Sequence, residues 1–111
     1  MYIQKSSSRN KNRLHANFEN AAHSVHSINM QGYGSNINVI VNIRSYADNE
    51  SRIYEPITED GRNFDEKQYS IPYSELEFQP SSNPMQELER ASIAWLVANH
   101  SDYKDGVIVN E

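Results

Sequence analysis

The stretch that decides the fold is INVIVNIRSY, residues Ile37–Tyr46. Every second residue from Ile37 to Ile43 is apolar and β-branched, and, apart from Ile40, the residues between them are polar. This period of two, in residue types that are enriched in strands, predicts a β-strand with one buried face. The preceding QGYGSN, residues 31–36, has glycines on both sides of a tyrosine and predicts a turn.

The clearest helix is predicted downstream, from Asn83 to about Asn99. Asn83 is a capping residue, Pro84 occupies the first helical position and Gln86 follows the cap by three residues. The side that the spacing makes apolar contains Leu88, Ala91, Trp95 and Ala98. After the helix, Val107–Val109 is a continuous apolar run, which predicts a short strand inside the sheet.

The rest of the chain gives weaker patterns. Between residues 14 and 28, apolar residues recur at steps of four and three, which predicts a helix; they are Leu14, Phe18, Ala21, Val25 and Ile28. Residues 52–58 and 69–78 are predicted as further strands, and Asp60-Gly61 predicts a turn between them. Pro56 places the first of these strands at an edge or a bulge.

These elements together predict an α+β fold. It consists of a small, mainly antiparallel sheet, a C-terminal helix packed on one face and a weaker N-terminal helix. A length of 111 residues suits one domain. Residues 1–12 are rich in Ser, Asn, Lys and Arg, so we expect a basic disordered tail there, followed by a single α+β domain over residues 13–111.

The composition excludes several classes of protein. The chain has no cysteine, which excludes disulfides, thiolate metal sites and cysteine nucleophiles and favours a reducing compartment. No apolar stretch is long enough for a signal peptide or a transmembrane helix. We therefore expect a cytoplasmic protein that has no membrane partner.

No motif predicts catalysis, a metal or a small-molecule cofactor. On the predicted N-terminal helix, His15, Glu19, His23 and His26 would share the polar side. His15 and His23 would lie about 12 Å apart along a helix, so one metal would not reach both. The segment GYGSN lacks the order of a nucleophile elbow, and it precedes a strand, whereas a phosphate loop precedes a helix. An enzyme of unrecognised type would instead require a pocket with convergent, perturbed titratable groups.

Charge is distributed unevenly along the chain. The net charge is −5, yet the first eighteen residues contain four basic residues, Lys5, Arg9, Lys11 and Arg13, and no acid. Residues 19–111 carry six basic and fifteen acidic side chains, a net charge of −9. One reading is therefore a nucleic-acid-binding accessory protein that uses the four basic residues to contact phosphate.

The acidic body supports a different reading. Nine acidic side chains fall between Asp48 and Glu77, and four of the seven tyrosines fall between Tyr46 and Tyr73. Tyrosine is enriched at protein interfaces, and dense carboxylates steer association with a basic surface. The predicted partner-binding residues are Tyr46, Asp48, Glu50, Tyr54, Glu55, Glu59, Asp60, Asp65, Glu66, Tyr69, Tyr73 and Glu75.

The function that we predict from this profile is inhibition by binding. Short, acidic, cysteine-free chains without catalytic motifs are typical of anti-defence inhibitors of phages and mobile elements, such as anti-CRISPR proteins, and of toxin-immunity proteins. The expected partner is a larger basic protein or a protein–nucleic-acid complex, and no catalytic activity is expected.

Two short segments carry a resemblance to a known family. PITEDGRNF, residues 56–64, and YKDGVIVN, residues 103–110, look like parts of the ADP-ribosyltransferase-like domains of phage polyvalent proteins. The match covers under a fifth of the chain, and Lys104 separates the Tyr and Asp that are adjacent in the family. The strand with the family's catalytic glutamate would follow Glu111, so the resemblance implies an inactive relic of that fold.

Overall fold

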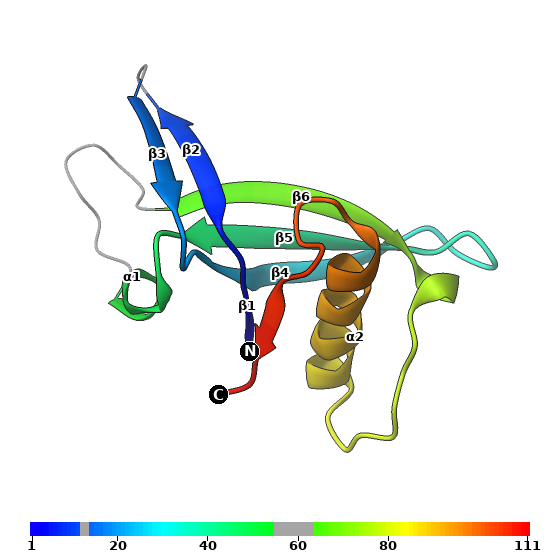
Figure 1. Cartoon of the computed structure of the whole chain (residues 1–111). Coiled ribbons are helices and arrows are strands. Elements are labelled where there is room, and N and C mark those ends of the chain that lie inside the picture. Colours follow the sequence, from blue (N-terminus) through cyan, green and yellow to red (C-terminus); the bar gives the residue numbers. More distant parts are fainter. Residues whose placement is uncertain (12–13, 55–63) are drawn as a thin grey trace.

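The strand predicted from INVIVNIRSY is an interior strand of the sheet that organises the protein. The computed structural model describes residues 1–11, 14–54 and 64–111. Its main sheet has five antiparallel strands in the order β6-β5-β4-β1-β7 (Figure 1). Their bounds are β1 Tyr2–Gln4, β4 Ala22–Gln31, β5 Asn38–Tyr46, β6 Phe64–Pro72 and β7 Val107–Val109. Val39, Val41 and Ile43 of β5 are fully buried on one face, which confirms the predicted strand and its alternation.

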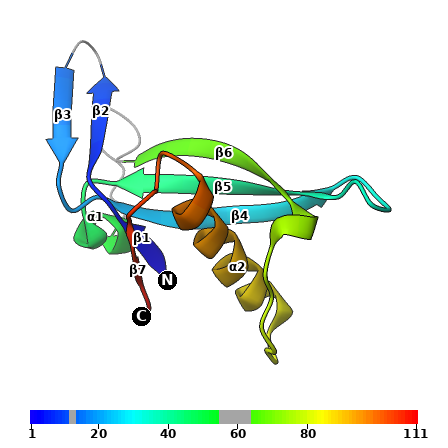
Figure 2. The ribbon, with the colours of Figure 1, turned by 45° about the vertical axis from the view of Figure 1, so that its right-hand side comes forward.

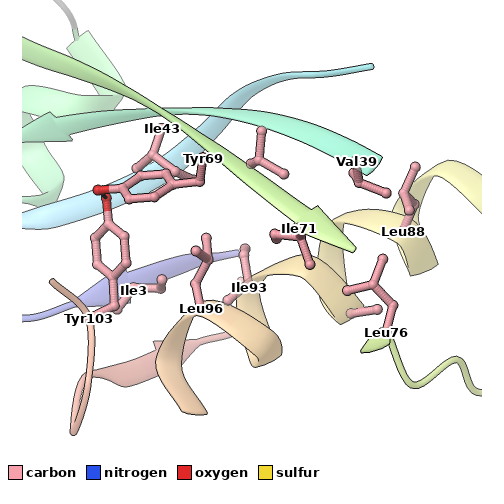
Figure 3. Close-up of a cluster of buried hydrophobic side chains, with 12 residues drawn as sticks. Ile3, Val39, Ile43, Tyr69, Ile71, Leu76, Leu88, Ile93, Leu96 and Tyr103 are labelled. Atoms are coloured by element: carbon pink, nitrogen blue, oxygen red, sulfur yellow. Dashed lines mark hydrogen bonds between the residues drawn. The ribbon is translucent and has the colours of Figure 1, made fainter. Parts of the chain in front are cut away.

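Helix α2, Pro84–Asn99, covers that buried face (Figures 1 and 2). Its predicted start is confirmed, because the Asn83 side chain accepts a hydrogen bond from the Gln86 backbone N–H at 3.1 Å. Leu88, Ile93 and Leu96 pack against β5, β6 and β1 in the core (Figure 3). The α+β class, with a C-terminal helix on one face of an antiparallel sheet, is therefore confirmed.

The buried side of α2 is rotated from the predicted one. Ile93 and Leu96 are buried, whereas Ala98 is exposed and Trp95 is only partly buried. Trp95 and Ala98 instead face the segment after β6 across a groove. The side with Ile93 and Leu96 and the side with Trp95 and Ala98 have nearly equal apolar content. Packing against the sheet therefore decides which side of the helix is buried.

The predicted N-terminal helix over residues 14–28 is wrong. These residues form β3, Leu14–Phe18, and most of β4. A register shift between Val25 and Ser27 adds a residue to β4, so Val25 and Ile28 both pack on the α2 side although they are three residues apart. The bulge thus imitates helical spacing, and the many Ser, Asn and His residues weaken a helix in this segment.

The predicted disordered tail is also wrong for most of its length. β1 pairs with both β4 and β7, and the Ile3 side chain is 0% exposed. β2, Ser7–Lys11, pairs with β3 in a separate two-stranded sheet that projects from the main one (Figure 1). The sequence did not predict these strands because the segment is mostly polar, with Tyr2 and Ile3 as its main apolar residues.

The segments around β6 differ from their predicted bounds. Part of the strand predicted over residues 52–58 is instead the short helix α1, Asn49–Tyr54, and the predicted turn at residues 59–63 lies outside the described residues. β6 begins at Phe64 and ends at Pro72, after which Tyr73–Glu75 form a 3₁₀ turn, η1. Proline lacks an N–H donor, which accounts for the end of the strand at Pro72.

At the C-terminal end, Val107–Val109 forms a strand as predicted, but β7 lies at the edge of the sheet rather than inside it. Across the described ranges, no helix has the length and apolar content needed to cross a membrane.

Candidate functional site: a groove and a polar pocket

Within the described ranges, the predicted partner-binding residues do not form one continuous face. Tyr46 and Tyr69 are 4% and 8% exposed and belong to the interior, so we leave their rings out of the docking surface. Tyr54 ends α1. Glu55, Glu59 and Asp60 lie outside the described residues.

The remaining described residues of the prediction separate into two groups at opposite ends of β6, four acids at one end and Tyr73 with Glu75 at the other. At the β6 start, Asp65 pairs in register with Ser45 and Glu66 with Arg44. Asp48 and Glu50 lie at the same end, just after β5, and the Ser51 backbone N–H lowers the pKa of the Asp48 carboxyl. Tyr73 and Glu75 lie beyond the other end of β6, beside α2.

At that second end, a groove runs between residues 75–79 and α2. Its volume is about 420 Å³, and Trp95 and Phe78 line it together with Glu75 and Glu77. The Tyr73 and Phe78 rings pack with their centroids 5.4 Å apart, yet they remain 39% and 43% exposed. The groove therefore combines exposed aromatic surface with acidic side chains.

One ion pair fixes the wall of the groove. The Arg90 guanidinium donates to both Glu87 carboxylate oxygens, at 2.5 and 2.8 Å, and to the Glu77 backbone oxygen at 2.9 Å. Glu87 also accepts from the Gln79 backbone N–H at 2.7 Å. The hydrogen bonds from Arg90 and Gln79 lower the pKa of the Glu87 carboxyl to about 2. The positive charge of Arg90 is thus paired with Glu87, and among the described residues no cation pairs with the Glu75 or Glu77 carboxylate.

A second, smaller pocket lies near the loop after α2. Its volume is about 220 Å³. The residues that line it are Ser6, Ser7, His23, Ser45, Asp65, Lys67, Tyr69, Asp102 and Tyr103. Strands β4, β5 and β6 contribute His23, Ser45 and Tyr69, and the loop contributes Asp102 and Tyr103.

A chain of hydrogen bonds connects these side chains. The Tyr69 hydroxyl donates to an Asp102 carboxylate oxygen at 2.7 Å and lies 2.8 Å from the Tyr103 hydroxyl (Figure 3). Tyr103 is also hydrogen-bonded to Ser45. A carboxylate only accepts, so Tyr69 uses its one proton on Asp102 and accepts from Tyr103. The single hydroxyl proton of Tyr103 therefore has two acceptors, Tyr69 and Ser45.

His23 is the last member of this hydrogen-bond network and has a defined tautomer. Its Nε2 lies 3.0 Å from the Lys5 backbone oxygen, and its Nδ1 lies 2.6 Å from Ser45 Oγ. A carbonyl oxygen only accepts, so Nε2 carries the proton and Nδ1 accepts from the Ser45 hydroxyl. Burial lowers the pKa of the imidazole below its ordinary value of 6.5. His23 is therefore a neutral ring whose Nδ1 lone pair accepts the Ser45 hydroxyl proton.

The neighbouring hydroxyls and carboxylate have perturbed pKa values as well. Burial raises the pKa of the Tyr103 hydroxyl to about 12 and raises that of Tyr69 further. The hydrogen bond from Tyr69 lowers the pKa of the Asp102 carboxyl, and Lys67 Nζ, 3.6 Å away, acts in the same direction. Near neutral pH, both tyrosines thus remain donors and Asp102 remains an anion.

Sequence reasoning missed this pocket because the key segment was predicted as a helix. His23 and Ser45 are direct partners across β4 and β5, so a correct strand assignment places them side by side. Asp65 and Tyr69 were assigned to the docking face instead. His100 Nδ1 lies 3.7 Å from Asp102 Oδ2, beside the same cluster.

Of the four basic residues near the N-terminus, Lys5 follows β1, and Arg9 and Lys11 belong to β2. Lys5 Nζ donates to the Lys104 backbone oxygen. Arg9 and Lys11 lie two residues apart on β2, and Arg13 lies outside the described residues.

No metal cluster is apparent in the described part of the chain, where no three His, Cys, Asp or Glu side chains gather closely enough to hold an ion. Searches with family models, against curated proteins and against solved structures find no match to this chain. Of the two segments that resemble ADP-ribosyltransferase-like domains, residues 103–110 contain the loop after α2 and β7, and most of residues 56–64 lies outside the described residues.

The stability of the protein is expected to fall between neutral and mildly acidic pH because of His23. The folded-state pKa lies below the unfolded value, so the unfolded chain binds a proton first, and stability decreases as the pH drops below about 6.5. The limiting slope is about 1.4 kcal/mol per pH unit for one proton. The charge of Asp102 favours protonation of the ring, whereas the charges of Lys67 and Lys5 oppose it.

Thermal unfolding of wild type and His23→Gln at pH 7.5, 6.5 and 5.5 tests this expectation. Glutamine retains one donor and one acceptor but does not titrate, so its melting temperature should fall less over this range. His26→Gln, at an exposed position of the same strand, is the matched control and should follow the wild type. Equal pH dependence in all three proteins would exclude His23 as the cause.

Proposed function

We propose that this protein is a small acidic binding protein that inhibits a larger basic partner by docking on it. The observation that carries the proposal is the groove beside α2, where exposed Tyr73 and Phe78 lie next to Trp95 and two carboxylates without a cationic partner among the described residues. The partner is a basic protein or a protein–nucleic-acid complex. Anti-defence inhibitors and toxin-immunity proteins act in this way.

The aromatic side chains supply the affinity in this proposal. Tyrosine and tryptophan are typical binding hot spots because they bury a large area with few rotatable bonds. The partly exposed Phe78 and Tyr73 rings are already held against each other, which lowers the entropy cost of ordering them in a complex. The hydrogen bonds of Arg90 and Gln79 to Glu87 hold the same wall in place before binding.

In this proposal the Glu75 and Glu77 carboxylates make the protein prefer a basic partner. Glu75 and Glu77 stand at the rim of the groove, and the net charge of the chain is −5. Rim charges mainly raise the association rate and its dependence on ionic strength, and a basic surface is selected over a neutral one.

Capture of the partner from a nuclease-treated lysate of the source organism, followed by binding kinetics, tests the proposal. Glu75→Lys combined with Glu77→Lys should slow association at low salt by about tenfold or more, with a flatter salt dependence. Trp95→Ala should mainly speed dissociation. Met85→Ala, an exposed apolar residue outside the groove lining, is the control and should leave both rates unchanged.

The same experiment distinguishes the nucleic-acid reading. The pair of Arg9→Glu and Lys11→Glu changes β2, which is separate from the main sheet. If the Arg9→Glu and Lys11→Glu pair abolishes capture and the Glu75→Lys and Glu77→Lys pair does not, the groove is not the docking site. Capture that occurs from an untreated lysate but not from the nuclease-treated one would point to nucleic acid as the ligand.

A further inference from the structure

We propose that Ser45 is a nucleophile that His23 activates and that it accepts the acyl group of a small ester in the pocket near the loop after α2. This activity concerns a different site from the groove, since Ser45 and His23 line the smaller pocket and Trp95 lines the larger one. Either proposal therefore stands or fails without the other.

The Ser45 and His23 contact has the geometry of an activated nucleophile. Ser45 Oγ lies 2.6 Å from His23 Nδ1, and the Lys5 backbone oxygen, 3.0 Å from Nε2, orients the ring and fixes its tautomer. A hydroxyl, a base and a group that orients the base are the three parts that such catalysis requires. His23 is only 4% exposed and packs edge-on against the Tyr103 ring at 5.2 Å, so the ring is held in this orientation.

The neighbouring tyrosine supplies a donor for developing negative charge. Tyr103 is hydrogen-bonded to Ser45 and keeps its proton at neutral pH. The oxygen of a carbonyl attacked by Ser45 would become negatively charged beside this hydroxyl. Tyr103 carries one hydroxyl proton, which Tyr69 and Ser45 share as acceptors before the reaction, so this proton would turn toward the carbonyl oxygen as the negative charge develops.

Protons and electron pairs balance over the two steps. Ser45 Oγ forms a bond to the acyl carbon, the carbonyl electron pair moves to its oxygen, and the hydroxyl proton passes to His23 Nδ1. When the carbonyl reforms, the bond to the leaving alcohol breaks and this alcohol takes the proton from His23. Water then attacks the acyl-Ser45 with His23 as base, which releases the acid and regenerates the hydroxyl.

The pocket limits the substrate to a small ester without negative charge. A volume of about 220 Å³ is below the usual range for drug-sized ligands. Asp65, Asp102 and Lys67 line the pocket and give it a net negative charge at neutral pH, which disfavours anionic esters.

Labelling with a small dialkyl fluorophosphate tests the nucleophile. The full-length chain should gain one phosphoryl group with loss of HF, and peptide mass spectrometry should locate it on Ser45. His23→Gln should slow the labelling by about 100-fold or more, the range of general base catalysis, and Tyr103→Phe by about tenfold or more. Ser70→Ala, at an exposed position of β6 outside the pocket, is the control and should label like the wild type.

Two results would overturn the inference. One is wild-type labelling that is absent or falls on other side chains, which needs no variant to interpret. The other is an unchanged rate in His23→Gln whose circular dichroism matches the wild type. The pH profile separates a base from a structural residue, because the wild-type rate should fall as His23 becomes protonated below its pKa. Release of nitrophenol from p-nitrophenyl acetate, with a burst of one equivalent per chain, should accompany acetylation of Ser45.

Discussion

Deletion of residues 1–5 is expected to unfold the protein or to remove most of its stability. β1 lies between β4 and β7, so its loss separates β7 from the sheet and exposes an edge of β4. Ile3 is fully buried, and truncation of such a side chain alone costs about 2–5 kcal/mol. The total stability of a domain this size is roughly 5–15 kcal/mol, so the combined loss approaches the whole.

Urea denaturation followed by far-UV circular dichroism measures this effect. The milder variant Ile3→Ala should lower the free energy of unfolding by about 2–5 kcal/mol and remain folded. Gln4→Ala, on the same strand but only partly buried, is the control and should cost about 0.5 kcal/mol or less. A deletion that leaves the denaturation midpoint unchanged would restore the interpretation of these residues as a disordered tail.

Leu96→Ala is expected to have the second largest effect, a loss of about 3 kcal/mol and a fall in melting temperature of roughly 10–20 °C. Leu96 is fully buried between α2 and the sheet, beside Ile93 and Ile3 (Figure 3). Removal of its branched end leaves a cavity that the rigid sheet cannot fill, so the cost includes lost packing as well as lost burial.

Met85→Ala gives a matched comparison on the same helix. Met85 is 62% exposed, so the same kind of truncation should change the melting temperature by little. The pair also checks the rotation of α2. Equal and small effects of both substitutions would mean that Leu96 does not lie in the core and that the predicted side with Trp95 and Ala98 does.

The two candidate sites share structural supports. β6 and its continuation carry Tyr69 at the pocket and Glu75 at the groove, and α2 forms a wall of the groove and leads into the loop that carries Tyr103. Variants that loosen α2 should therefore weaken both sites, and for this reason each site is tested with side chains that lie outside the buried core.

Local sequence signals predicted the elements whose patterns are simple. In β5 every second residue from Val39 to Ile43 is apolar, and α2 begins after a capping asparagine followed by proline. Both elements were therefore predicted close to their observed bounds. Neighbouring segments misled the same reasoning. The bulge at His26 gave β4 a helical spacing, and the polar composition around Tyr2 and Ile3 concealed a strand of the main sheet.

By itself, the sequence determined the α+β class, the acidic character of the body, the interior strand β5 and the C-terminal helix, because period, capping and charge act over a few residues along the chain. Only the tertiary structure decided that His23 meets Ser45, that Tyr69 and Tyr103 join them, and that Trp95 faces a groove rather than the core. Those contacts depend on strand register and helix rotation, which pairing and packing between distant segments set and no local pattern encodes.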